Sequence, residues 1–350
     1  MKITFICNKV TGRGGTETVL VKVLNELKKR NYNIRLILSN LTEDKTWLTK
    51  IDSRISYKYP QNDSRLGRLA YFTKVFFNSN KNEIFIILSP NLVKYFSTLK
   101  KIFHKNIKVV SWIHFSLKHQ DFFNPSVLIP ADYHLAISSA IKKQLMDMGV
   151  PERKIFLIFN PADKHEKIVD KPLDGKKHLL YVGRVQYDGQ KNLKEMLNGL
   201  KNVSDEIVLD VFGSGKDLEK CQQKCKELGI QNIVNWHGWC NDVWKTINFK
   251  PFAIILTSKY EGLPMVFLEA LSYGIPCISS NFDGFNDVID EHKNGFSYCL
   301  GNVHELSNTI EKMSGINFDA SVVQKSINKF YDDKYYWQLE KVLNIIDSAK

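Results

Sequence analysis

Apolar and polar positions alternate along the first half of the chain in a pattern that predicts short buried strands between helices or loops. Val19, Leu20, Val23, Leu24 and Leu27 recur at helical spacing, which predicts an amphipathic helix over residues 16–30. Short apolar runs predict strands at residues 2–7, 34–38, 84–88, 109–113 and 134–137. This alternation favours a mainly parallel sheet wrapped by helices.

The pattern restarts after a polar stretch at residues 161–177, which contains two prolines and a glycine and is interpreted as a linker. Beyond it, strands are predicted at 179–182, 207–212, 233–236, 253–256 and 276–279, and helices at 191–201, 216–228, 264–273 and 303–313. The fold class is therefore α/β, with two doubly wound domains at 1–165 and 178–330. The amphipathic tail 331–350 is expected to pack back on the first domain. Ligands of such sheets sit outside the carboxyl ends of the strands, so residues just after strands are the candidates for chemistry.

Composition agrees with a folded two-domain protein. The chain has 350 residues, of which 43% are hydrophobic and 25% are charged, and disorder is excluded on that ground.

Cys221 and Cys225 lie one helical turn apart, but no second pair follows at ligand spacing, so we expect no zinc site. The cysteine pattern fits a reducing compartment. No apolar run approaches the roughly 20 residues of a spanning helix, and the early polar Asn8 argues against a signal peptide. We expect a cytoplasmic protein, with attachment to a membrane surface left open.

The net charge of +12 is concentrated in the first half of the chain. Residues 1–170 contain 28 Lys and Arg against 14 Asp and Glu, a balance of +14, whereas the remainder contains 21 against 23, a balance of −2. Such an asymmetry predicts an anionic partner for the first half.

The segment from Glu261 to Glu269 is the strongest chemical signal. Two carboxylates eight residues apart bracket a Gly-Leu-Pro turn that follows an apolar strand, and Pro264 suits the first turn of a helix. The exposed amides of a helix start can hold phosphate, and Glu269 could accept hydrogen bonds from ribose hydroxyls. Spacing alone favours a capped helix that carries two solvated acids.

A family resemblance adds to this interpretation. The segment resembles the glutamate-seven-residues-glutamate motif of retaining glycosyltransferases of family 4, which have the GT-B fold of two Rossmann-like domains facing across a cleft. Further matching stretches cover nearly the whole chain: Gly12 to Glu17, Ser111 to Ser116, Ala136 to Ser139, Tyr181 to Arg184 with Lys191, and Phe212 to Gly215. The chain also resembles, more narrowly, the bacterial lipopolysaccharide core 1,6-galactosyltransferases that use UDP-galactose. Residues 114–117, 131–139 and 274–279 carry that narrower match.

The resemblance implies a role for each matching residue of the second domain, which would bind the nucleotide-sugar. Glu261 would contact hydroxyls of the donor sugar and Glu269 the ribose, while Arg184 and Lys191 would neutralise the diphosphate leaving group. The segment between these two cations is one residue longer than in many relatives. Contacts to the donor are also implied for Gly183, Gly213, Trp239, Gly262, Leu263 and Pro264. Trp239, with Trp236 and His237, is expected near the uracil, although aromatic packing explains at least one of the three.

In the first domain, which would bind the acceptor, the resemblance implies that Gly14 and Gly15 let the backbone approach the donor phosphates. A dinucleotide-binding loop is the rival interpretation, but the chain has no G-x-G-x-x-G spacing. His114 follows a strand and would sit near the donor sugar, although a lone histidine is more often structural. The retaining mechanism commonly described for the family is front-face attack, in which the leaving phosphate takes the acceptor proton.

The expected function is transfer of a hexose, galactose from UDP-galactose, to a lipopolysaccharide or lipooligosaccharide core sugar. Alternatives are UDP-glucose or another donor with a different glycan acceptor, and a non-catalytic nucleotide-sugar-binding module. No Asp-x-Asp pair occurs, so we expect no metal and no cofactor, with the UDP-sugar acting as substrate. The expected partners are the donor, an anionic glycan and a membrane surface. The basic residues follow no nucleic-acid recognition motif, so nucleic acid is not expected.

Overall fold

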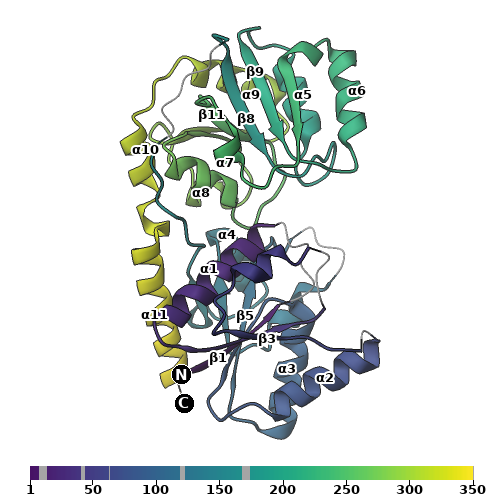
Figure 1. Cartoon of the computed structure of the whole chain (residues 1–350), viewed down its shortest axis with the longest axis vertical. Coiled ribbons are helices and arrows are strands. Elements are labelled where there is room, and N and C mark those ends of the chain that lie inside the picture. The colour runs from purple at the N-terminus through teal and green to yellow at the C-terminus, as the bar shows by residue number, and fades with distance from the viewer. Residues whose placement is uncertain (8–13, 41–43, 63, 119–122, 168–173, 350) are drawn as a thin grey trace. The chain divides into compact units, whose positions relative to one another are not determined.

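The computed structural model describes residues 1–350 except 8–13, 41–43, 63, 119–122, 168–173 and 350. Gly12 and part of the predicted linker lie outside the described residues. The chain divides into two compact units, Met1–Pro161 with Asp333–Lys350, and Ala162–Asp332. Each unit is a parallel sheet with helices, as the alternating pattern predicts, and the α/β fold class is confirmed (Figure 1).

The sheet of the first unit has the order β3-β2-β1-β4-β5-β6-β7. Its described strands are β1 (Lys2–Cys7), β2 (Asn33–Leu38), β3 (Ser56–Lys58), β4 (Ile84–Ile87), β5 (Lys108–Ile113), β6 (Tyr133–Ala136) and β7 (Ile155–Leu157). Its helices are α1 (Gly15–Lys29), α2 (Arg65–Phe77), α3 (Pro90–Phe103), α4 (Ser139–Asp147) and α11 (Asp332–Ser348). The order reverses between β1 and β4, and the carboxyl ends of the strands at such a reversal are where ligands of these sheets bind.

The C-terminal helix α11 belongs to the first unit. It buries Leu339 and Leu343, and Gln338 donates a hydrogen bond to the Leu157 carbonyl oxygen of β7 at 2.6 Å. Arg30, at the end of α1, pairs with Glu340 at 2.7 Å. These contacts hold the last helix against the sheet that begins the chain.

The sheet of the second unit has the order β10-β9-β8-β11-β12-β13, with the reversal between β8 and β11. Its strands are β8 (Lys177–Val182), β9 (Ile207–Phe212), β10 (Val234–Gly238), β11 (Ala253–Leu256), β12 (Cys277–Ser280) and β13 (Gly295–Tyr298). Its helices are α5 (Leu193–Leu200), α6 (Leu218–Leu228), α7 (Val243–Thr246), α8 (Met265–Ser272), α9 (Val303–Ser314) and α10 (Ala320–Ser326). Nearly every residue of β8, β9 and β11 is buried, because helices or loops cover both faces of a parallel sheet.

The boundary between the units differs from the expected one at residue 165. The backbone N–H of Ala162 donates to the Phe330 carbonyl oxygen at 2.8 Å, and the His165 ring stacks on Tyr273 with centroids 4.3 Å apart. Both contacts belong to the second unit, which therefore begins at Ala162. Within the described residues, no helix combines the length and apolar character needed to cross a membrane.

Candidate active site

The loops after β8, β9 and β10 are tied together at the carboxyl ends of their strands. Gly183 donates its backbone N–H to the Phe212 carbonyl oxygen at 3.0 Å, and Gly213 donates to the Gly238 carbonyl oxygen at 2.7 Å. A Cβ atom at Gly213 would lie 1.8 Å from the Gly183 carbonyl oxygen, so only glycine fits there. Trp239 follows directly, with half of its surface exposed. Gly183, Gly213 and Trp239, all predicted site residues, therefore lie in one group of joined loops.

The Glu261 carboxylate is held at the other side of the reversal point, in the loop between β11 and α8. Lys191 pairs with its Oε1 atom at 2.7 Å, and the Ser258 hydroxyl donates to the same oxygen at 2.6 Å. Gln190 donates to Oε2 at 3.3 Å. Lys191 and Glu261 are both largely buried, so this is a partly desolvated ion pair with further hydrogen bonds on the acid. Two residues that are 70 positions apart in the sequence, each predicted for the site, are thus in direct contact.

Gln190 links this pair to the second predicted cation. Its Oε1 atom accepts a hydrogen bond from an Arg184 guanidinium nitrogen at 2.9 Å, while its Nε2 atom also donates to the Tyr260 carbonyl oxygen at 3.0 Å. The exposed Arg184 is therefore connected through one amide to the buried Glu261 and Lys191. Sequence reasoning missed Gln190. The extra length of the segment between Arg184 and Lys191 was a signal that this loop has a local structure of its own.

Glu269 lies in α8, and the Trp244 indole nitrogen donates to its Oε2 atom at 3.2 Å. Trp244 belongs to the short helix α7, and its ring packs against Tyr273 with centroids 4.9 Å apart. Pro264 directly precedes the first residue of α8 and is not part of its first turn as predicted. Gly262 and Leu263 complete the turn before it. Trp244 was not predicted, because nothing in its local sequence shows a contact 25 residues away.

Gly14, Gly15 and His114 belong to the first unit. Gly14 immediately precedes α1, which begins at Gly15. His114 follows β5, and its ring lies against Trp112 with centroids 4.3 Å apart. Its Nε2 atom is buried and makes no hydrogen bond with the described residues. Burial lowers the pKa of His114 to about 3, so its imidazole is neutral at ordinary pH.

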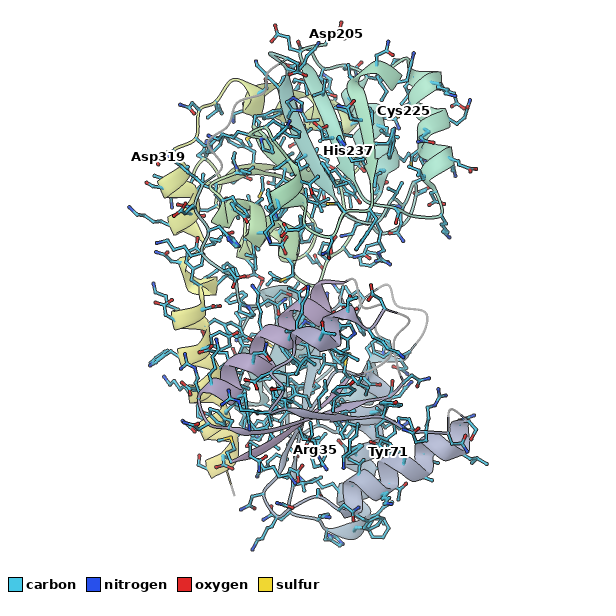
Figure 2. The ribbon with its side chains drawn as sticks, viewed as in Figure 1. Arg35, Tyr71, Asp205, Cys225, His237 and Asp319 are labelled. Carbon is cyan, nitrogen blue, oxygen red and sulfur yellow. The ribbon has the colours of Figure 1, made fainter. Side chains whose placement is uncertain are left out.

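His237, expected with Trp236 and Trp239 near the uracil, contacts two residues of β9. Figure 2 labels this residue in the second unit. Its Nε2 atom is 2.7 Å from Asp210 Oδ1, and its ring stacks on Phe212 with centroids 4.2 Å apart. His178 Nδ1 lies 2.6 Å from the other oxygen of the same carboxylate. Burial works against protonation of His178, but the hydrogen bond and charge of Asp210 outweigh it and raise the pKa of His178. This cluster joins β8, β9 and β10 beneath the loops that carry the predicted nucleotide contacts.

Two cysteines lie one helical turn apart in the second unit. Cys221 and Cys225 are buried in α6, and burial raises the pKa of their thiols to about 12 and about 11. Thiols with such raised pKa values stay protonated at neutral pH. Across the described residues, no group of three His, Cys, Asp or Glu side chains is arranged to hold a metal ion.

The family models place these two parallel-sheet units among the sugar-transferring enzymes. Residues 163–317 match the family model described as glycosyl transferases group 1, and residues 13–166 match the one described as glycosyltransferase family 4. The chain therefore belongs to glycosyltransferase family 4 and has the GT-B fold.

Among its relatives is the lipopolysaccharide 1,6-galactosyltransferase of Salmonella typhimurium, 36% identical over 96% of this chain and 96% of that protein. The Escherichia coli K12 protein of the same name is 35% identical over 98% of each chain. A solved structure described as the apo form of the lipopolysaccharide outer core galactosyltransferase WaaB matches with a TM-score of 0.85 and 32% identity, covering 98% of this chain and 99% of that one. Anabaena HepE, solved with UDP, shares the fold with a TM-score of 0.81 at 19% identity, covering 98% and 100% of the two chains.

Proposed function

We propose that the protein transfers galactose from UDP-galactose to a sugar of the lipopolysaccharide or lipooligosaccharide core, with retention of the anomeric configuration and without a metal ion. The two named galactosyltransferases align with this chain from end to end, which supports the donor and the acceptor class. The observation that carries the catalytic proposal is the contact network from Arg184 through Gln190 to Glu261 and Lys191 at the reversal point of the second sheet.

This network suits the charge that develops during transfer. As the bond between the galactose anomeric carbon and the UDP oxygen breaks, negative charge grows on the diphosphate. Arg184 and Lys191 would stabilise that charge, because cations held in place before the reaction need no reorganisation. Lys191 is neutralised by Glu261 in the unliganded protein, and the diphosphate would share it.

The remaining site residues would hold the donor. Glu261 would accept hydrogen bonds from hydroxyls of the galactose, and Glu269 from those of the ribose. The leaving phosphate oxygen would take the proton of the acceptor hydroxyl, so no side chain need act as a base. A neutral His114 fits this scheme, since it could orient a hydroxyl and is too weakly basic to remove a proton.

The first unit would bind the acceptor at the inner face of the cytoplasmic membrane. Its sequence carries the +14 balance of residues 1–170, and a phosphorylated core glycan or an anionic leaflet is the complementary partner. The protein would thus attach peripherally to the membrane on which its acceptor is displayed.

A donor panel tests the proposal. UDP-galactose, UDP-glucose and UDP-N-acetylglucosamine are each offered with a truncated lipopolysaccharide acceptor, with and without EDTA, and the product is weighed by mass spectrometry. We expect transfer from UDP-galactose above the other donors and unchanged by EDTA. Preference for UDP-glucose would contradict the donor, and turnover that EDTA abolishes and Mg²⁺ restores would contradict metal independence.

A further inference from the structure

Trp244 places the polar end of its side chain against a residue of the candidate site. It belongs to α7, which follows β10 and the exposed Trp239, and its side chain reaches the neighbouring helix α8 (Figure 1). There the indole nitrogen donates to the Glu269 Oε2 atom at 3.2 Å, and both side chains are partly buried. An indole N–H therefore points at the carboxylate that is proposed to hold the ribose.

The Trp244 ring rests on a supported surface. It packs against Tyr273 with centroids 4.9 Å apart, and Tyr273 stacks in turn on His165 with centroids 4.3 Å apart and ring planes that differ by 6°. Gln324 of α10 donates its Nε2 atom to the carbonyl oxygens of both His165 and Ser272 at 2.8 Å. Because Ser272 is the last residue of α8, the ring that supports Trp244 is fastened to the end of that helix.

The short helix α7 is also fixed at its start. The Asp242 side chain caps it by accepting a hydrogen bond from the Lys245 backbone N–H at 3.2 Å, and Val243 is buried. A helix of four residues is not stable by itself, so α7 is held by this cap, by the burial of Val243 and by the packing of Trp244. The indole group thus has a defined place in the unliganded protein.

A hydrogen bond from an indole changes what a carboxylate can do. A glutamate side chain has several rotatable bonds, and ordering it when a ligand binds costs affinity. The N–H of Trp244 orients the Glu269 carboxylate without neutralising its charge, and a carboxylate that accepts one hydrogen bond keeps lone pairs for further donors. This arrangement suits the recognition of hydroxyl groups, since they donate to the lone pairs that remain.

We propose that Trp244 is a positioning residue, which holds Glu269 in the orientation that receives the ribose hydroxyls and so makes the site selective for nucleotides with a complete ribose. A site built to accept hydrogen bonds from hydroxyls disfavours a ligand that lacks them, because the acceptor is then left unpaired in a partly desolvated place. The inference deepens the proposed function and rests on the ribose contact that is given there for Glu269.

The test compares the binding of UDP and of 2′,3′-dideoxy-UDP to the full chain by calorimetry. Wild type should prefer UDP by about 10–100-fold, because the dideoxy nucleotide makes no hydroxyl bond to the carboxylate. Trp244→Phe keeps an aromatic ring against Tyr273 and removes the N–H. It should weaken UDP by about tenfold and leave the affinity for dideoxy-UDP unchanged, and that unchanged affinity shows that the variant is folded. Trp337→Phe, at an exposed residue of α11 in the first unit, is the matched control and should alter neither affinity.

A double-mutant cycle shows whether Trp244 acts through Glu269. In a Glu269→Ala background, Trp244→Phe should cause no further loss of UDP affinity. An additive loss, or equal weakening of UDP and dideoxy-UDP by Trp244→Phe alone, would overturn the inference, since the indole would then only pack α7. So would a UDP preference in Trp244→Phe as large as that of wild type. If wild type itself bound the two nucleotides equally, the ribose contact of Glu269 in the proposed function would be wrong, and this inference would fall with it.

Discussion

Replacing Lys191 with methionine should damage both stability and turnover, and the two effects can be separated. Lys191 is 14% exposed and Glu261 is 9% exposed, with the two charged groups 2.7 Å apart. Removing one partner of a buried ion pair costs about 3–5 kcal/mol, because the other charge is left without compensation. Glu261 keeps its hydrogen bonds from Ser258 and Gln190, so we expect a loss of about 2–3 kcal/mol. For a unit of this size the melting temperature should fall by roughly 5–10 °C.

Turnover should fall by about 10²–10³-fold, which is typical for loss of one group that stabilises transition-state charge. The double variant Lys191→Met with Glu261→Gln removes the stranded carboxylate. Its melting temperature should return to that of Glu261→Gln alone. Its turnover should remain well below that of Glu261→Gln, because the cation proposed to act on the diphosphate is still missing.

The assay combines thermal unfolding followed by circular dichroism with steady-state transfer from UDP-galactose. Lys194→Met is the matched control, since Lys194 is more exposed and its nearest carboxylate oxygen lies 3.9 Å away. It should change neither quantity appreciably. If the double variant turned over as fast as Glu261→Gln alone, Lys191 would serve only to neutralise the acid, and its proposed role at the leaving group would be refuted.

Three further outcomes follow from the site. Gln190→Ala should lower kcat by roughly tenfold with a small change in melting temperature, since it removes the link to Arg184 and leaves the buried ion pair intact; unchanged kcat would make Gln190 a packing residue. Glu269→Ala should weaken UDP itself in calorimetry while Glu261→Ala weakens mainly the sugar-bearing donor, and equal losses of UDP affinity would undo this division. Burial raises the pKa of the Asp210 carboxyl group, but its hydrogen bonds with His178, His237 and Asn235 outweigh burial and lower that pKa. The stability that Asp210 contributes is therefore complete above pH 3.8. The pKa of His178 is raised, so the stability that this histidine contributes is complete below pH 6.5. The melting-temperature difference between wild type and Asp210→Asn should therefore be largest from pH 3.8 to 6.5 and shrink as the pH rises through the raised pKa of His178; a difference independent of pH would contradict this linkage.

The inner strands of both sheets could be predicted because parallel strands leave short, mostly apolar runs, whereas the edge strands β3, β7 and β13 were not predicted. Residues 207–212 and 253–256 were predicted as strands with the bounds that the structure has. Helix ends shifted by one or two residues, as at α5, which begins at Leu193 and not at residue 191. The reason is local: Asn192 adopts a left-handed backbone conformation just before the helix, and no pattern of hydrophobicity reports that.

The candidate site was predictable as a set of residues and not as a set of contacts. Motif resemblance pointed to Lys191 and Glu261 separately, but their ion pair joins positions 70 apart in the chain. The exposure of a helix also depends on contacts that the fold creates. In α2, Phe72 and Phe76 pack against Phe96 of α3 and are buried, while Leu66 and Phe77 are exposed. Which lysines are neutralised depends in the same way on neighbours that only the fold brings together.

The linkage formed in the product tests the central claim most directly. Purified protein, UDP-galactose labelled with ¹³C in the sugar and a truncated lipopolysaccharide acceptor are incubated, and the product is examined by NMR. The account predicts one added galactose in the α configuration, joined through oxygen 6 of the acceptor sugar. A β-linked galactose would contradict retention. Release of free galactose without any transfer to the core would contradict the proposed reaction itself.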